Sequence, residues 1–172
     1  MPEAPSGVLA LPHFTPTGPP EFIADSVGVL AGLRLETPRG EVLKGLLEGA
    51  NYYLRELVDS LGGAGIEIAD FRAVGGGSKS DAWLQLSADI YARPVVRPAV
   101  TEAGAFGAAI IAGAGAGVFD SMEQAAEAMV TLEATFEPDS ARQSLHERRY
   151  EQYRKLWPLM KDYLRKIAKP LG

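Results

Sequence analysis

The chain has 172 residues, of which 47% are hydrophobic and 23% are charged, a composition typical of one globular domain with a hydrophobic core. The formal net charge is −5 and the 17 lysine and arginine residues are scattered, so no basic face for nucleic acid is expected. The absence of cysteine excludes disulfides, thiolate catalysis and cysteine-ligated zinc. With no disulfide framework and no secretory signal in the sequence, a cytoplasmic location is expected.

The first part of the chain is predicted to be irregular, and the second to be a long helix. Residues 1–20 hold six of the twelve prolines, which predicts an extended loop, and residues 21–36 favour a loop with a short strand or helical turn. A helix is predicted over 39–61, with Thr37 as N-cap and Pro38 in the first turn. Its apolar residues recur at helical spacing and predict one buried stripe. They are Val42, Leu43, Leu46, Leu47, Ala50, Leu54, Leu57, Val58 and Leu61.

Short strands and glycine-rich helices are predicted to follow. We expect a strand over 71–74, a helix over 81–91, a strand over 95–97 and a second helix over 102–114. The uncharged run 103–119 contains five glycines and is shorter than the about 20 residues that a membrane span needs, so it predicts a helix packed closely against a neighbour. Ser121 and Gln124 form the capping box of another helix. This order of elements indicates an α/β architecture.

The end of the chain, 140–169, is predicted to be a long charged helix with a kink at Pro158. Its aromatic and aliphatic residues predict a second buried stripe, which comprises Tyr150, Tyr153, Leu156, Trp157, Met160, Tyr163, Leu164 and Ile167. The two histidines, His13 and His146, are far apart in the sequence, and the nearby carboxylate at ligand spacing is that of the helix-surface Glu147, so both histidines are expected on the surface.

The segment GGGSKS, residues 75–80, is the best candidate for a binding site. Three successive glycines allow a ligand to lie against the backbone, and the helix that follows presents unpaired N–H groups and a positive dipole end. The segment matches neither the P-loop pattern nor GxGxxG. Taken alone it is also compatible with a tight turn that binds nothing.

The second glycine cluster, which starts at Thr101, favours a ligand site. The two segments, GGGSKSDAWLQLSADIYARPV from Gly75 and TEAGAFGAAIIAGAGAGVF from Thr101, resemble the adenosine-binding part of the FGGY carbohydrate kinases, and xylulose kinases in particular. Further signatures of that family, D-x-x-G-x-x-x-G-L, L-E-G and R-[DE], have counterparts upstream. These are Asp25 to Leu33, Leu47-Glu48-Gly49 and Leu54-Arg55-Glu56.

The resemblance implies an actin-like, ribonuclease-H-like α/β fold, of which this chain is the carboxy-terminal domain. Residues 1–20 are then a proline-rich loop, and residues 21–172 are part of the ATP-binding domain, which we expect to lack its first strands. Gly76 and Ser80 match residues that contact adenosine and its α-phosphate, Gly75 and Gly77 would shape the loop, and Ser78 would be a peripheral contact, as would Lys79.

The resemblance also implies ATP and Mg²⁺ as cofactors of the full-length enzyme and a sugar or polyol as its acceptor. No catalytic residue is expected within the chain, because the family's catalytic aspartate and phosphate loops lie upstream of the matched part. The isolated chain is therefore expected to be inactive and, with an uncovered helix stripe, to form a homo-oligomer. Val27 replaces an arginine common in the family, Trp83 and Gln85 are assigned to packing, and Glu102 is equally explained by the helix dipole.

Two other hypotheses remain open. In the first, the chain is a complete, non-catalytic nucleotide-binding module. In the second, it is a kinase remnant that serves as an oligomerisation module. Nucleotide affinity distinguishes the first from the second.

Overall fold

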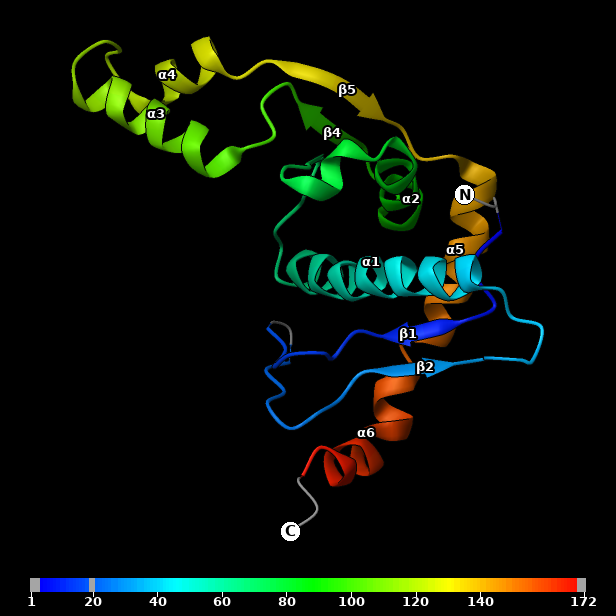
Figure 1. The fold of residues 1–172 in the computed structure, drawn as a ribbon. Coiled ribbons are helices and arrows are strands. Elements are labelled where there is room, and N and C mark those ends of the chain that lie inside the picture. The colour runs from blue at the N-terminus through cyan, green and yellow to red at the C-terminus, as the bar shows by residue number, and fades with distance from the viewer. Residues whose placement is uncertain (1–3, 19–20, 170–172) are drawn as a thin grey trace. The chain divides into compact units, whose positions relative to one another are not determined.

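The structure is a computed structural model that describes residues 4–18 and 21–169 (Figure 1). Its contacts divide the chain into two compact units, which are described separately below. The first comprises residues 1–68, 89–92 and 138–172, and the second comprises residues 69–88 and 93–137. The division falls within helix α2 (Asp81–Tyr91), whose last residues belong to the first unit.

The first unit begins with a two-stranded antiparallel sheet of β1 (Leu9–Leu11) and β2 (Val29–Ala31), and helix α1 (Arg39–Gly63) lies against β1 (Figure 1). The expectation that residues 1–20 are an irregular loop is wrong at β1. In the apolar run from Val8 to Leu11 all residues except the half-buried Leu9 are buried, with Val8 1% and Ala10 0% exposed. Burial of these side chains outweighs the proline-rich composition around them.

Helix α1 buries a different face from the predicted leucine stripe. Its buried residues are Lys44, Gly45, Glu48, Gly49, Asn51 and Tyr52. Of the predicted stripe, Leu43 is 48% exposed and Leu54 is 40% exposed. A Cβ at Gly45 would lie 2.6 Å from the Val8 carbonyl oxygen, and a Cβ at Gly49 would lie 2.2 Å from that of Ala10. The absence of side chains at 45 and 49 therefore allows the backbone of β1 to pack against this face.

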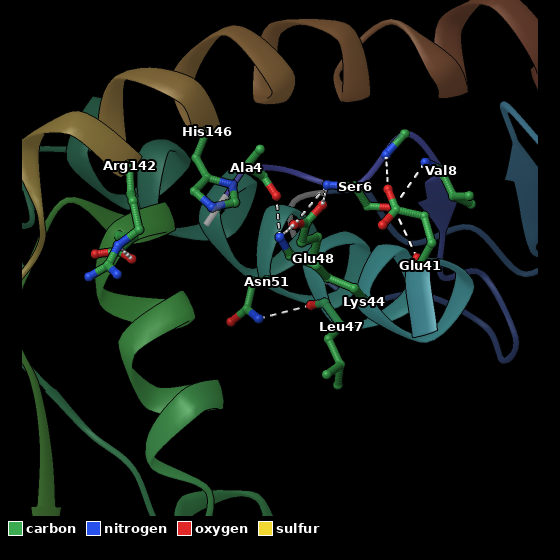
Figure 2. A network of polar contacts seen from close by, with 12 residues as sticks. Ala4, Ser6, Val8, Glu41, Lys44, Leu47, Glu48, Asn51, Arg142 and His146 are labelled. Carbon is green, nitrogen blue, oxygen red and sulfur yellow. Dashed lines mark hydrogen bonds and ion pairs between the residues drawn. The ribbon is translucent and has the colours of Figure 1, made fainter. Parts of the chain in front are cut away.

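A buried polar network joins α1 to the segment before β1 (Figure 2). The Ser6 amide donates to both Glu48 carboxylate oxygens, at 3.1 and 2.9 Å, and the Lys44 ammonium lies 3.4 Å from Glu48 Oε1 and donates to the Ala4 carbonyl. Burial raises the pKa of Glu48, while the Ser6 amide and Lys44 oppose this shift. Because both charges are paired, the network satisfies the polar groups that α1 buries.

Both histidines are buried, so the surface expectation is wrong. His13 is 4% exposed and its Nδ1 lies 2.8 Å from the Ser26 hydroxyl. His146, which is 1% exposed, lies on α5 (Ser140–Tyr153) with its Nδ1 2.8 Å from the Tyr52 hydroxyl of α1. Desolvation lowers the pKa of His146 to about 4, so the ring is neutral near pH 7. Each ring fills a buried position because a neighbouring hydroxyl pairs with its nitrogen.

The carboxy-terminal stretch forms two helices, α5 and α6 (Leu156–Ile167), instead of one kinked helix. The interruption lies at Arg154 and Lys155, one turn before Pro158. Proline has no N–H to donate to the carbonyl four residues earlier, and it is tolerated in the first turn of a new helix. Of the predicted second stripe, Tyr150, Tyr153 and Leu164 are each 1% exposed, whereas Tyr163 is 62% exposed.

A three-stranded sheet forms the centre of the second unit, with strand order β3 (Phe71–Arg72), β4 (Val95–Pro98) and β5 (Leu132–Phe136). Strands β3 and β4 are parallel, and β4 and β5 are antiparallel. The sequence analysis missed β5, although its apolar residues alternate with polar ones, and its side chains are exposed or half-buried.

Two further helices, α3 (Ala103–Gly115) and α4 (Met122–Met129), lie against each other (Figure 1). The Ser121 cap is confirmed, because its hydroxyl accepts from the Gln124 amide at 3.1 Å. Helix α3 contacts a neighbour, as expected, although none of its residues is buried. Among the residues that the structure describes, no helix is both long enough and apolar enough to cross a membrane.

Candidate functional site

The GGGSKS segment forms a compact turn between β3 and α2. Gly75 has φ +79°, a conformation that favours glycine, and it leads into the 3₁₀ helix η1 (Gly76–Lys79). The backbone amide and the hydroxyl of Ser78 both donate to the Gly75 carbonyl, at 3.2 and 2.7 Å. Ser78 is 2% exposed, so its side chain braces the turn from within.

The three glycines have different surroundings. A Cβ at Gly75 or Gly76 would meet no atom within 4 Å, whereas a Cβ at Gly77 would lie 3.0 Å from Cζ3 of Trp83. The first two glycines therefore border open space, and the third is covered by the indole ring. This contact supports the assignment of Trp83 to packing, and Gln85, which donates to the Glu137 carbonyl at 2.8 Å, also has a structural contact.

Ser80 lies at the start of α2. Its carbonyl accepts from the Leu84 amide at 3.0 Å, and its hydroxyl accepts from the Trp83 amide at 3.3 Å. These are the contacts of a helix N-cap. The first turn of α2 therefore places partly positive N–H groups next to the glycine turn, in an arrangement that attracts anionic groups.

The structure brings the two glycine-rich segments together. The Gly75 amide donates to the Thr101 carbonyl at 2.8 Å, just before α3 begins. The Lys79 ammonium lies 3.9 Å from Glu102 Oε1, and both side chains are exposed. Since an exposed pair of this kind contributes little to stability, the backbone bond is the firmer link. The helix starts that the sequence analysis identified thus lie next to one turn.

Arg97 of β4 holds the turn in place, a role that the sequence analysis did not assign. Its Nη1 donates to the Ser78 carbonyl at 3.2 Å and to Asp81 Oδ1 at 2.6 Å, and its Nη2 donates to Glu133 Oε1 at 3.2 Å. The hydrogen bond that Arg97 donates to Asp81 and the charges of Glu133 and Asp81 raise the pKa of Arg97. The sequence signal that could have indicated this role is a charged residue within the otherwise apolar four-residue strand β4.

The residues that the structure describes were also compared with the requirements of a metal site. In the described ranges, 4–18 and 21–169, no three histidine, aspartate or glutamate side chains are arranged to hold a metal ion. The turn thus offers backbone amides, a hydroxyl and a lysine, which suit a ligand with polar and anionic groups.

Comparison with known proteins gives the family. The model of the FGGY family of carbohydrate kinases, C-terminal domain, matches residues 2–116. The chain belongs to this family. The xylulose kinase of Staphylococcus epidermidis is 30% identical over 157 residues, which are 91% of this chain and 32% of that protein. This chain therefore spans about a third of the length of the curated relatives that it matches.

Solved structures agree on the fold. The ligand-bound xylulose kinase from Lactobacillus acidophilus superposes with a TM-score of 0.83 at 20% identity, covering 95% of this chain and 34% of that one. The glycerol kinase of Plasmodium falciparum, solved with ADP, gives a TM-score of 0.72 at 25% identity, covering 95% of this chain and 33% of the other. The FGGY chain thus has the actin-like ATPase fold of these kinases, as expected from its sequence.

Proposed function

We propose that this chain is the ATP side of a carbohydrate kinase, which transfers the γ-phosphoryl group of ATP to a hydroxyl group of a sugar or polyol. In this proposal the chain binds the adenosine half of ATP at the Gly75–Ser80 turn. Membership of the FGGY family supports the reaction class. The observation that carries the site is the open space beside Gly75 and Gly76, which lies next to the start of α2.

The residues of the turn have distinct roles in this proposal. Gly75 and Gly76 leave room for the nucleoside against the backbone, because neither presents a Cβ. Ser80 and the first amides of α2 are positioned to donate to the α-phosphate. Ser78 and Gly77 shape the turn through their contacts with Gly75 and Trp83. Arg97 keeps the turn against β4.

Phosphoryl transfer needs a base that orients the acceptor hydroxyl, donors around the γ-phosphoryl group, and Mg²⁺ to neutralise charge on the phosphates. We infer that these come from outside the present chain, together with the sugar contacts. The isolated chain is then inactive, and the identity of the sugar depends on the remainder of a longer protein.

Calorimetric titration of the chain with ATP and ADP, with and without Mg²⁺, tests the proposal. Gly76→Val should weaken binding by at least about tenfold, because the new side chain fills space meant for the ligand. It should leave the unfolding midpoint unchanged, since a Cβ there meets no protein atom within 4 Å. Gly62→Val, at another open glycine on α1, is the matched control and should bind normally.

Two results would contradict the proposal. Equal binding by wild type and Gly76→Val would place the nucleotide elsewhere. Absence of binding up to millimolar ATP, together with a stable homo-oligomer, would favour the oligomerisation module.

A further inference from the structure

A cavity lies in the first unit, where α1, α5 and the start of α6 meet the segment around β1. Its volume is about 420 Å³, within the size range of small-molecule sites. Its walls carry three carboxylates, Glu21, Glu56 and Asp59, and one cation, Arg154. Aromatic rings, including those of Tyr153 and Trp157, form much of the rest. The cavity is thus both acidic and aromatic.

Two polar groups in this cavity lack the partners that burial normally requires. Tyr153 is 1% exposed, yet its hydroxyl has no hydrogen-bond partner among the described residues. Buried tyrosine hydroxyls are usually hydrogen-bonded. Glu56 is half-buried and makes no hydrogen bond or ion pair within the described part of the chain, so its carboxylate is available to a ligand. Burial, together with the charges of Glu21 and Asp59, raises the pKa of Glu56 to about 7, while Arg154 opposes the shift.

The other two carboxylates are already engaged and fix the walls. The Trp157 indole donates to Glu21 Oε2 at 3.1 Å, and the Tyr150 hydroxyl donates to Asp59 Oδ2 at 2.7 Å. The aromatic residues and their carboxylate partners therefore form a connected wall, with Glu56 and Tyr153 as its unpartnered polar groups.

Guanidinium groups already lie over the rings of this cluster. The Arg55 guanidinium lies 4.2 Å from the centre of the Tyr150 ring, and that of Arg165 lies 5.5 Å from the centre of the Trp157 ring. Rings of this kind attract cations through their electron-rich faces. The same combination of aromatic faces and carboxylates lines the cavity.

We propose that this cavity is a binding site for a guanidinium or alkylammonium group, with Glu56 as its carboxylate partner and the Tyr153 hydroxyl as its acceptor. Inorganic cations fit less well, because no three carboxylate or histidine groups in the described ranges are placed to hold a metal ion. The group could belong to a free small molecule or to an arginine or lysine side chain of a polypeptide. The site lies in the first unit and does not depend on nucleotide binding in the second.

The probes for the test are ethylguanidinium, ethylammonium and the uncharged isostere ethylurea. Trp157 reports directly from the cavity wall, and Trp83→Phe removes the other of the two tryptophans. We expect the two cations to change the fluorescence of Trp157 in a saturable way above pH 7, where Glu56 is ionised. Ethylurea at equal concentration should leave this fluorescence unchanged.

Matched variants distinguish specific binding in the cavity from non-specific electrostatic attraction to the chain. Glu56→Gln keeps the shape and should weaken cation binding roughly tenfold or more, and Tyr153→Phe should weaken it roughly threefold or more. Glu127→Gln, which removes an exposed carboxylate on α4, should have no effect. The folded state of each variant is checked by its circular dichroism spectrum.

A capped arginine tripeptide and free ethylguanidinium, compared in the same assay, distinguish the two sources of the group. Tighter binding of the peptide would indicate a polypeptide partner, and tighter binding of the small cation would indicate a free amine or guanidine. Equal responses to ethylurea and the cations, unchanged affinity in Glu56→Gln, or absence of a saturable response would overturn the proposal and leave a water-filled cavity.

Discussion

Gly49→Ala is expected to destabilise the first unit, although alanine is a better helix former than glycine. The new Cβ would lie 2.2 Å from the Ala10 carbonyl oxygen and 2.9 Å from its Cβ, distances that require α1 and β1 to separate. The gain in helix propensity is about 1 kcal/mol, and overpacking of this kind costs about 1–3 kcal/mol or more. Separation would also stretch the Ser6–Glu48 bonds, so the free energy of unfolding should fall by about 1–3 kcal/mol.

Gly40→Ala in the first turn of the same helix is the control. A Cβ there meets no atom within 4 Å, so the substitution should increase stability by about 0.5–1 kcal/mol. Urea denaturation followed by circular dichroism measures both variants. If Gly49→Ala were as stable as Gly40→Ala, the close approach of β1 to α1 would not exist in solution.

The remaining predictions concern pH and association. Burial raises the pKa of Glu56 from 4.5 to about 7, so the folded state holds the proton more tightly than the unfolded state. The free energy of unfolding should therefore decline as pH rises between these values. Urea denaturation at pH 5 and 8 measures this decline, and Glu56→Gln should reduce it by roughly 1–3 kcal/mol. Desolvation lowers the pKa of His146 from 6.5 to about 4, so the unfolded state takes up a proton at higher pH than the folded state. The free energy of unfolding should therefore fall as pH drops from 6.5 to about 4, and His146→Gln should reduce this dependence on pH. The chain should self-associate through the exposed side of α1, and Leu43→Lys combined with Leu54→Lys should shift its sedimentation toward a monomer; a monomeric wild type at tens of micromolar would contradict this.

The sequence predicted those elements whose signals are local. Helix α2 has the predicted bounds, and the cap at Ser121 is confirmed, because helical spacing and capping residues act within a few positions. The glycine turn was also predicted, since three glycines between a strand and a helix permit few alternatives. The resemblance of the two glycine-rich segments to the FGGY kinases was then confirmed by the match to that family.

Features that depend on tertiary contacts were not predictable in this way. The leucine periodicity of α1 pointed to the wrong face, because the contact with β1 depends on small residues at 45 and 49 instead of large ones. The burial of His146 depends on Tyr52, which is 94 positions away. Arg97 likewise acquires its role only when β4, α2 and β5 meet around it.

The glycines of this chain show why residue type alone does not specify a role. At Gly49 the space that a Cβ would need is filled by atoms of β1, whereas at Gly76 that space is open in the structure. Adding a side chain should therefore have different effects at the two positions. Alanine at 49 should reduce stability, while a larger residue at 76 should reduce nucleotide affinity and leave stability unchanged. A loss of stability at both would mean that the turn is a packed element of the second unit, and the adenosine proposal would lose its main support.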